Sequence, residues 1–551
     1  MSKLSRRGFL AGAAGPVGAG AAARRPNVLL FITDDQGYGD LSLHGNPHLK
    51  TPHMDGVAAA GVRFTQFQVS PVCSPTRASL MTGRYNYRTG VVDTYLGRSL
   101  MDPGEVTLAE VLRGAGYRTG LFGKWHLGDN YPLRAIDQGF DEALALKGGG
   151  LAQPSDPPES QGSYFDPVLQ HNGKPERRRG YCTDVFTDAA LEFLEANRGR
   201  PFFAYVAPNA PHSPLQVEER WAAPYRAEGL DDATARVYGM VANLDYNLGR
   251  LLAKVRELGL ERDTIAIFLS DNGVAGRRYN AGMRGTKGTV YQGGIRAPFF
   301  LRWPGGAARG ALVDRIAAHI DVLPTLAEAC GAHLPAGVRL DGKSLLPLVR
   351  DARAAWPDRT LYTQWHRGDE PVLYRGCAAR TQRYKLVDGK ELYDLEADEG
   401  ERNDVAAANP EVAAGMRRGY EEWFRDVSAT RGYQPPRIYI GTPHENPVVL
   451  TRQDWRGPRA GWDADSLGYW EVDVREAGRY EVRVRMAATA ADGDVEVRLN
   501  GAVLRQGVKS GAEEAALGEA RIPAGAGRLE AAWRAGGRET GVRYVTLRRV
   551  E

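Results

Sequence analysis

Two pairs of oxygen-bearing side chains follow apolar runs of the sequence and could hold a divalent cation. Asp34 and Asp35 come directly after one run, and Asp271 and Asn272 come directly after another. Because open α/β sheets build their sites at the carboxyl ends of strands, we expect these side chains to face one another. An all-oxygen set favours Ca²⁺ or Mg²⁺ over zinc, which prefers His and Cys. Each pair taken alone is more often part of a helix cap or a turn than of a metal site.

The stretch from Cys73 to Arg84 carries the strongest chemical signal in the chain. It reads Cys-Ser-Pro-Thr-Arg-Ala-Ser-Leu-Met-Thr-Gly-Arg, so a cysteine precedes a proline and an arginine at fixed offsets and opens a predicted helix. A lone cysteine is normally a small buried hydrophobe, and we expect the other three cysteines to be of that kind. At Cys73, the helix N-terminus and Arg77 make the surroundings positive and suited to an anion.

This stretch resembles the signature of the formylglycine-dependent sulfatases, an arylsulfatase-like family of the alkaline phosphatase superfamily. In that family the cysteine is oxidised to an aldehyde before or during folding. The similarity extends from about Pro26 to Val405, and a nearby departure is Gln292, where the family usually has Glu. The further matching segments are the first metal motif at 26–40, the second signature at 123–128, the histidine loop at 208–214, the second metal motif at 270–273 and the later lysine segment at 284–288.

The resemblance implies a role for each motif. Cys73 would be converted to formylglycine by a formylglycine-generating enzyme, and one hydroxyl of the aldehyde hydrate would attack sulfur. A bound Ca²⁺ or Mg²⁺ would polarise the sulfate group. The implied metal ligands are Asp34, Asp35, Asp271 and Asn272. The implied cations facing the transition state are Arg77, Lys124 and Lys287. His212 would protonate the leaving group, and His126 would take the proton of the second hydroxyl to expel sulfate.

Strands alternating with helices must position these motifs. Continuous apolar runs predict strands buried on both faces, and apolar residues at helical spacing predict helices between them. The alternation predicts an α/β fold, a mostly parallel sheet flanked by helices, which the resemblance specifies as alkaline-phosphatase-like. The predicted strands are 27–33, 201–207 and 264–270, and the predicted helices are 107–113, 184–197 and 237–258.

The pattern changes after about residue 355. Short strand-like pieces precede one helical segment at 411–424, which predicts a small antiparallel sheet with a packed helix. Pro435-Pro436 marks a linker, and alternating apolar residues with a tight-turn signal at Asn500-Gly501 predict a C-terminal β-sandwich. The expected division is a signal peptide at 1–23, a catalytic domain at 24–355, a small subdomain at 356–433 and a sandwich at 437–551.

The N-terminus resembles a Tat export signal. Arg6-Arg7 is followed by a weakly apolar stretch and a small-residue cleavage site at Ala21-Ala22-Ala23. No later segment approaches the ~20 apolar residues of a membrane helix. We therefore expect a periplasmic or secreted protein that is exported by the Tat machinery and has no stable membrane insertion.

The composition argues against a nucleic-acid-binding protein and against a disulfide-rich scaffold. The 551 residues include 71 Lys+Arg and 67 Asp+Glu, and this small net charge of +4 gives no case for a nucleic-acid partner. Four cysteines exclude a disulfide-dense scaffold. If Cys73 is modified, three thiols remain, which allow at most one intramolecular disulfide.

Three functions compete on this basis. The leading hypothesis is a sulfatase that hydrolyses sulfate monoesters of carbohydrates or aryl compounds and releases inorganic sulfate. A phosphonate or phosphate monoester hydrolase is the close rival, because phosphate is nearly isosteric with sulfate and some relatives share the motifs. A non-catalytic receptor for sulfated glycans is the third, and the intact catalytic motifs argue against it.

Substrate loops and the sandwich leave alternatives open. The loops at 93–99, 148–180, 276–283 and 365–370 are candidates to line the pocket, and their Arg, His and Tyr content suits an anionic or hydroxyl-rich substrate such as a sulfated sugar. The sandwich is either a structural cover, which we favour, or a carbohydrate-binding module. The aromatic residues on which the second interpretation depends are Trp455, Trp462, Tyr469, Trp470 and Trp533.

Overall fold

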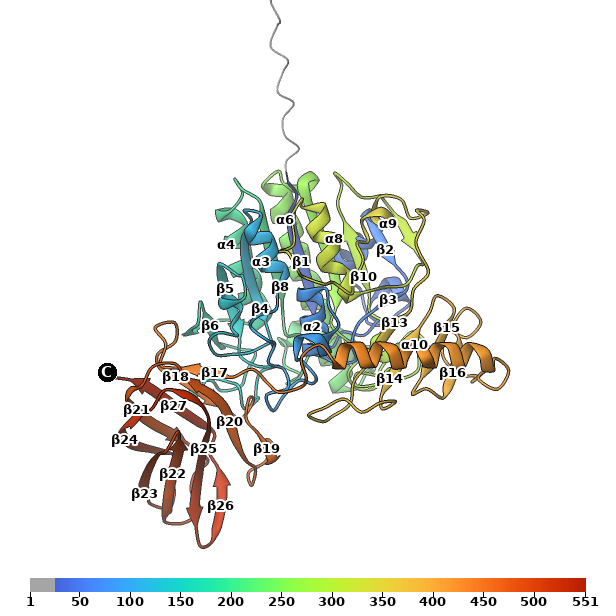
Figure 1. The fold of residues 1–551 in the computed structure, drawn as a ribbon. Helices are drawn as coiled ribbons and strands as arrows, with labels where there is room; N and C mark the ends of the chain where they lie inside the picture. Colours follow the sequence, from blue (N-terminus) through green and yellow to red (C-terminus); the bar gives the residue numbers. More distant parts are fainter. Residues whose placement is uncertain (1–24) are drawn as a thin grey trace, which may run out of the picture.

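A mostly parallel sheet lies at the centre of the computed structural model, which describes residues 25–551 (Figure 1). The predicted export signal at 1–23 lies outside the described residues. The sheet's strands are β1 (Asn27–Thr33), β2 (Val62–Phe64), β4 (Arg118–Lys124), β5 (Glu142–Leu146), β6 (Val168–His171), β7 (Lys174–Arg177), β8 (Phe202–Ala207), β9 (Thr264–Ser270), β10 (Phe299–Arg302) and β11 (Ala311–Val313). Their order is β11-β2-β10-β9-β1-β8-β4-β5-β6-β7. The five strands from β9 to β5 pair in parallel, so their carboxyl ends share one edge.

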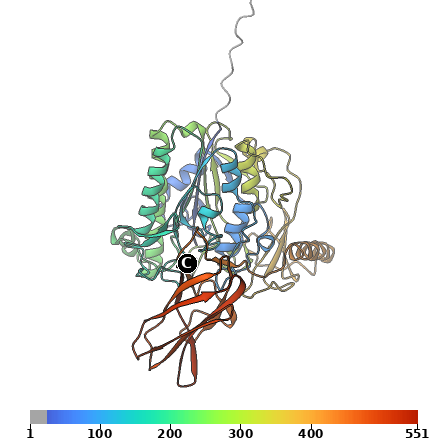
Figure 2. The same cartoon turned by 60° about the vertical axis from the view of Figure 1, so that its left-hand side comes forward.

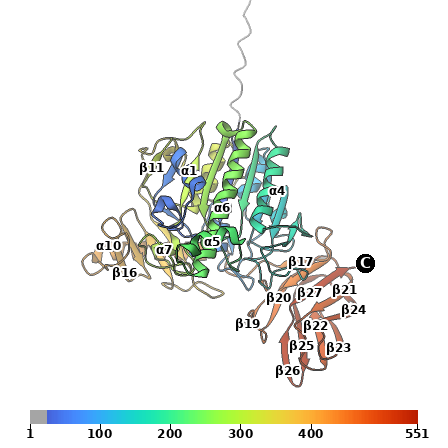
Figure 3. The same ribbon diagram turned by 180° about the vertical axis from the view of Figure 1, so that it is seen from behind.

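Helices cover both faces of this sheet. Figure 3 shows the face carrying α1, α4 and α6, and the other face carries α2, α3, α8 and α9. The helices are α1 (Pro52–Ala60), α2 (Cys73–Thr82), α3 (Leu108–Gly114), α4 (Cys182–Ala196), α5 (Glu219–Ala227), α6 (Asp232–Glu257), α7 (Gln292–Ile295), α8 (Val322–Ala329) and α9 (Leu346–Arg350). The α/β prediction is therefore confirmed, and the predicted strands and helices are present with small shifts in their ends.

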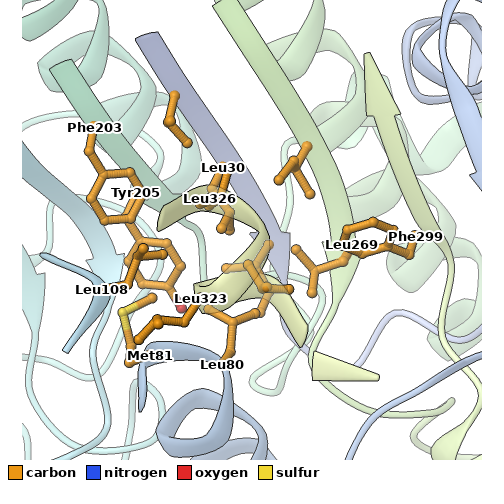
Figure 4. Close-up of a cluster of buried hydrophobic side chains, with 14 of the residues drawn as sticks. Leu30, Leu80, Met81, Leu108, Phe203, Tyr205, Leu269, Phe299, Leu323 and Leu326 are labelled. Carbon is orange, nitrogen blue, oxygen red and sulfur yellow. The ribbon is translucent and has the colours of Figure 1, made fainter. Parts of the chain in front are cut away.

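Alternation along β1 explains why residues 28–32 between its two ends are all apolar. Leu30 and its even-numbered neighbours enter one core, and Leu29 and Phe31 enter the other, on the opposite face. Figure 4 shows part of the first core, where Leu30 and Leu269 of the sheet gather with residues of α2 and α8. Since both faces are covered by helices, β1 has no polar side and every residue of it is buried.

The region after residue 355 forms separate, largely antiparallel sheets, as the fold prediction states, with one parallel pairing between 438–440 and 472–474. One sheet has the order β13 (Leu361–Gln364), β14 (Cys377–Arg380), β15 (Tyr384–Val387) and β16 (Glu391–Asp394), with α10 (Pro410–Ser428) packed on it. Its core also takes in Tyr85, Tyr87 and Ile316 from the N-terminal part. The small sheet is thus packed against the larger α/β unit.

Two further sheets enclose one core at the C-terminus. One runs β17 (Ile438–Ile440), β20 (Leu467–Val474), β25 (Gly525–Ala535), β22 (Gly493–Leu499) and β23 (Ala502–Val508), with β19 (Arg456–Arg459) and β26 (Arg538–Gly541) attached. The other runs β18 (Val448–Thr451), β27 (Tyr544–Arg549), β21 (Gly478–Arg485) and β24 (Glu514–Ile522). Trp455 and Trp470 are fully buried in the core between them and present no face to a sugar ring.

The C-terminal sandwich is held firmly against the α/β unit. Figures 1 and 2 show it below the central sheet, on the side where α10 also lies. Glu445 accepts hydrogen bonds from Asn130 Nδ2 at 3.0 Å and from the backbone N–H of Tyr131 at 2.7 Å. Tyr544 donates its hydroxyl to the carbonyl of Asp156 at 2.9 Å. These contacts make the sandwich part of the same packed body.

Two remaining features of the described chain bear on the predictions. Cys73, Cys182, Cys330 and Cys377 are all buried and free, and none of the four is in a disulfide. Among the helices of residues 25–551, none is long and apolar enough to cross a membrane.

A buried acid pair at the sandwich interface predicts how stability depends on pH. Burial, and then the negative charge of Asp129, raise the pKa of Asp454 well above its ordinary range, while Lys147 opposes them. The folded protein therefore keeps a proton that the unfolded chain releases above about pH 4, so this group's contribution to stability falls as pH rises from there toward the raised pKa. The variant Asp454→Asn has no such proton to release.

We expect the melting temperature of Asp454→Asn, minus that of the wild type, to increase as pH is raised from about 4 to about 8. Thermal unfolding followed by circular dichroism measures this difference. Asp465→Asn, at an exposed position of the same sandwich, is the matched control. A difference for Asp454→Asn that stays constant across the pH range would contradict the prediction.

Candidate active site

The ends of β1 and β9 bring the candidate metal ligands together. The two strands pair in parallel with Thr33 opposite Ser270, so the acidic residues that follow begin at the same level. Carboxylate oxygens of Asp34, Asp35 and Asp271 and the Sγ atom of Cys73 all lie within 4.8 Å of one another. Cys73 is 39 positions from Asp34 in the chain, and Asn272 is 237 positions from Asp35, yet all of them lie in one buried cluster.

Asn272 completes the oxygen set. Its Nδ2 donates to Asp35 Oδ1 at 2.9 Å, while its Oδ1 is buried and has no hydrogen-bond partner among the described residues. A buried amide oxygen left without a partner costs about 1–3 kcal/mol. A hard cation beside Asn272 would satisfy that oxygen, and the surrounding carboxylates have the chemistry that Ca²⁺ and Mg²⁺ prefer.

Cys73 opens α2 inside this cluster. The thiol donates to Asp34 Oδ1 at 3.4 Å, and every residue of α2 is buried. Burial, and then the negative charge of Asp34, raise the pKa of the Cys73 thiol to about 12, while the positive charges of Lys124 and Lys287 oppose them. Cys73 is therefore fully enclosed by the acids and cations of the site.

Each of the three carboxylates is paired with one cation. Lys124 Nζ lies 2.7 Å from Asp34, and both side chains are fully buried. Lys287 Nζ lies 2.5 Å from Asp35, with 22% of the lysine side chain exposed. Lys124 is the last residue of β4, the strand beside β8. The segment 123–128 therefore joins the two metal motifs and the Cys73 stretch at the site.

Arg77 forms the third pair, from the second turn of α2. Its guanidinium donates to Asp271 Oδ2 at 2.8 and 3.1 Å and to the carbonyl of Lys124 at 2.8 Å. Arg77 and Asp271 are both fully buried. This fork holds α2, β4 and β9 in register around the cluster.

Burial and charge act in opposite directions on the acids. Burial alone would raise the pKa of Asp35, but the positive charges of Lys287, His212 and Lys124 outweigh it and hold that pKa below its ordinary range. At Asp271, burial and the neighbouring Asp34 prevail over Arg77 and raise the pKa to about 6.

Two histidines stand beside the acids in different surroundings. The Nε2–H of His126 donates to the carbonyl of Thr94 at 2.8 Å, and Nδ1 is buried without a hydrogen-bond partner among the described residues. His212 donates from Nδ1 to the carbonyl of Ser213 at 2.7 Å, which leaves Nε2 at 3.9 Å from Asp35. Burial lowers the pKa of both imidazoles, to about 4 for His212 and well below its ordinary value for His126, so each ring keeps one nitrogen without a proton.

Glycines of the loop 148–180 form the wall behind these histidines. A Cβ added at Gly149 would lie 2.5 Å from Cε1 of His126, and one added at Gly150 would lie 3.0 Å from Cε1 of His212. Only residues without a side chain allow so close an approach. This loop was expected at the pocket, although the sequence did not indicate which of its residues contact the histidines.

The other three candidate loops also lie near the acids and histidines. Trp365 Nε1 and Arg367 donate to Asp93 at 3.0 and 2.8 Å, which joins the loops 93–99 and 365–370. In the loop 276–283, Arg278 binds Asp40 and donates to the carbonyl of Asp35 at 3.1 Å. The Arg278–Asp40 pair supports the turn that carries Asp35, and nothing in the sequence around Arg278 indicated this function.

Comparisons with known proteins agree with this geometry. A family model described as sulfatase matches residues 26–332, and a model for the C-terminal part of N-sulphoglucosamine sulphohydrolase matches residues 286–421. Human arylsulfatase A is 34% identical over 463 residues, a match that covers 72% of this chain and 87% of that protein.

Solved structures are similar over most of the chain. The crystal structure of Ps i-CgsB superposes with a TM-score of 0.68 at 28% identity, covering 74% of this chain and 95% of that one. The phosphonate monoester hydrolase of Agrobacterium radiobacter has a similar fold, with a TM-score of 0.53 at 24% identity, covering 74% of this chain and 96% of its own.

The buried Arg77–Asp271 pair predicts a large loss of stability on mutation. Arg77→Met leaves the buried carboxyl of Asp271 without its ion pair and hydrogen-bond donors, so we expect the metal-free protein to lose about 3–5 kcal/mol of unfolding free energy. Chemical denaturation in the presence of EDTA measures the loss. Arg383→Met, which removes a half-exposed ion pair with Asp394, is the control and should cost about 1 kcal/mol or less. Equal, small losses for both variants would contradict the importance of the buried pair.

Proposed function

The chain belongs to the sulfatase family, whose members hydrolyse sulfate esters, and from that premise we propose that it cleaves carbohydrate sulfate monoesters with a formylglycine nucleophile derived from Cys73. The observation that carries the proposal is the position of Cys73. It opens a buried helix within hydrogen-bond distance of Asp34, inside a cluster of three carboxylates that are each paired with a cation. A cysteine serving only as packing would not require this arrangement.

We assign the cation site to Asp34, Asp35, Asp271 and Asn272. The unpartnered Oδ1 of Asn272 and the all-oxygen composition of the set support Ca²⁺, with Mg²⁺ as the alternative. The bound cation would polarise the sulfate group and lower the pKa of the attacking hydroxyl. The ion pairs of Lys124, Arg77 and Lys287 hold the three carboxylates in place for this ligation.

Formylglycine supplies two hydroxyls on one carbon when its aldehyde is hydrated, one to attack sulfur and one to release sulfate. The Sγ atom of Cys73 stands where the attacking oxygen would be. Lys124 and Lys287, held in ion pairs with Asp34 and Asp35, place positive charge near this position and oppose the rise in the Cys73 pKa. Lys287 is the partly exposed member, so it is the cation that an incoming sulfate would reach first.

The two histidines suit opposite proton transfers. His126 holds a neutral imidazole whose Nδ1 is free, so it can accept the proton of the second hydroxyl. His212 presents Nε2 toward Asp35, and the negative charge of Asp35 favours the protonated form against the effects of burial and Lys287. The negative charge of a bound sulfate ester would act in the same direction as Asp35. We assign to His212, with the neighbouring Lys287, the protonation of the leaving alkoxide.

Carbohydrate sulfates are our choice of substrate class. The related Ps i-CgsB has been crystallised in complex with k-i-k-neocarrahexaose, an oligosaccharide. Arg367 lies over the rings of Tyr95 and Trp365, in loops that reach His126 through the Thr94 carbonyl, and such side chains suit a hydroxylated, anionic ring. Aryl sulfates would be accepted as small surrogate substrates.

Maturation and location complete the proposal. Conversion of Cys73 requires a formylglycine-generating enzyme, and the leader 1–23 would direct the protein to the periplasm or outside the cell through the Tat machinery. The proposed division is a catalytic domain at 24–355, a subdomain at 356–433 and a sandwich at 437–551.

The rival activity is phosphonate or phosphate monoester hydrolysis, since a phosphonate monoester hydrolase has the same fold. Initial rates on nitrophenyl sulfate, phosphate and phosphonate separate the two activities. We expect the sulfate to be the best substrate and Cys73→Ala to reduce its turnover by several orders of magnitude. Cys330→Ala, at a buried cysteine of the core, should keep near wild-type rates. Phosphonate turnover far above sulfate turnover would reject the sulfatase assignment.

The third hypothesis, a non-catalytic receptor, is tested by the same variant. If Cys73→Ala bound sulfated oligosaccharides and functioned in cells like the wild type, the conversion of Cys73 would have no part in the function.

Cation binding is testable without turnover. After EDTA treatment, we expect added Ca²⁺ to stabilise the wild type by about 3 kcal/mol at a hundredfold excess over its dissociation constant. Asn272→Ala removes one oxygen ligand and should need more Ca²⁺ for the same shift in melting temperature. Asn403→Ala, at an exposed asparagine, is the control. If neither Ca²⁺ nor Mg²⁺ moved the wild-type melting temperature, the assigned ligand set would be wrong.

A further inference from the structure

A loop of the C-terminal sandwich reaches the wall of the active site. The loop connects β18 to β19 and packs on the segment 93–99 of the α/β unit. The carbonyl of Gln453 accepts from the N–H of Gly97 at 2.9 Å, and Arg456 donates to the carbonyl of Leu96 at 3.2 Å. Leu96 itself is buried in the sandwich core. The segment 93–99 is therefore held by contacts with the sandwich as well as by contacts within the α/β unit.

The carbonyl of Thr94 joins this loop to a histidine of the site. It accepts from His126 Nε2 at 2.8 Å and from Gln453 Nε2 at 2.9 Å. A carbonyl can only accept, so Gln453 must present its amide N–H₂ group to it. Gln453 is 1% exposed, and its side chain also lies within 3.5 Å of the Ser99 hydroxyl.

This shared carbonyl determines which nitrogen of His126 is free. Because Nε2 donates to Thr94, the neutral ring must carry its proton on Nε2 and leave the lone pair on Nδ1. Among the described residues, His126 has no other hydrogen-bond partner, and Gly149 leaves no room for a side chain beside the ring. A shift or rotation of the Thr94 carbonyl would therefore change both the orientation and the tautomer of His126.

We propose that Gln453 of the sandwich is a positioning residue for the sulfatase reaction, acting by holding the Thr94 carbonyl that orients His126. The inference rests on the proposed function, in which His126 takes the proton whose loss releases sulfate. The sandwich is then a component of the catalytic machinery, joined to the site through one amide side chain. A sandwich acting only as a cover would have no need of a donor at this position.

Kinetics of Gln453→Met test the assignment, because methionine keeps the volume and removes the donor. We expect kcat on nitrophenyl sulfate to fall about tenfold or more with KM little changed. Release of the first nitrophenol should keep its wild-type rate, so the variant should show a burst followed by slow turnover. Gln506→Ala, at an exposed glutamine of the same sandwich, is the control and should match the wild type. The melting temperature of each variant shows whether it is folded.

A second readout does not depend on activity. In protein with ¹⁵N-labelled histidine, of which the chain has ten, ring nitrogen shifts report the tautomer of each imidazole. The resonance that disappears in His126→Gln identifies His126. We expect Nε2–H and unprotonated Nδ1 in the wild type and a mixture of tautomers in Gln453→Met.

The two readouts separate the possible failures. A wild type without sulfatase activity would reject the proposed function, and the tautomer of His126 would still decide whether Gln453 positions it. A protonated Nδ1 in the wild type, or a Gln453→Met variant with wild-type kcat and wild-type ring shifts, would overturn the positioning role.

Discussion

Three carboxylates share one buried site, and the rest of the structure depends on neutralising them. Removing a charged group from water costs several kcal/mol unless it is paired and hydrogen-bonded. Here Asp34, Asp35 and Asp271 each face one cation, and the cations come from β4, from α2 and from the loop that carries Lys287. The cluster can form only when the ends of β1, β9 and β4 and the start of α2 converge. The same geometry leaves three carboxylates beside an Asn272 oxygen that has no hydrogen-bond partner within residues 25–551, and we propose that a cation binds there.

The architecture supplies the rigidity that this convergence requires. Parallel strands with apolar residues on both faces hold the strand ends at fixed positions between two layers of helices. The histidines lie outside the ion pairs and are oriented by backbone carbonyls, His126 by Thr94 and His212 by Ser213. The two kinds of side chain are thus held by different means. Ion pairs fix the carboxylates, the lysines and the arginine, whereas backbone carbonyls of loops orient the histidines.

Much of this organisation could be predicted from the sequence, where local pattern and function coincide. The buried runs of β1, β8 and β9 and the long helix α6 are dictated by apolar spacing, and the signature around Cys73 indicated the family. The strand β4 escaped prediction because Arg-Thr-Gly-Leu-Phe-Gly-Lys contains two glycines and charged ends. The contact of Gln453 with Thr94 joins residues 359 positions apart, and no local sequence pattern predicts it. The same holds for the Arg278–Asp40 pair, whose residues are 238 positions apart in the chain.

The proposed reaction depends on the chemical state of one residue. Carboxylates of Asp34, Asp35 and Asp271 lie around the Sγ atom of Cys73, and the proposed nucleophile at this position is an aldehyde hydrate in the mature enzyme. A mass spectrum of the peptide containing Cys73, taken from protein whose sulfatase activity has been measured, tests this most directly. The account predicts the mass of formylglycine in a fraction that tracks specific activity across preparations. An unmodified thiol at Cys73 in fully active enzyme would contradict it.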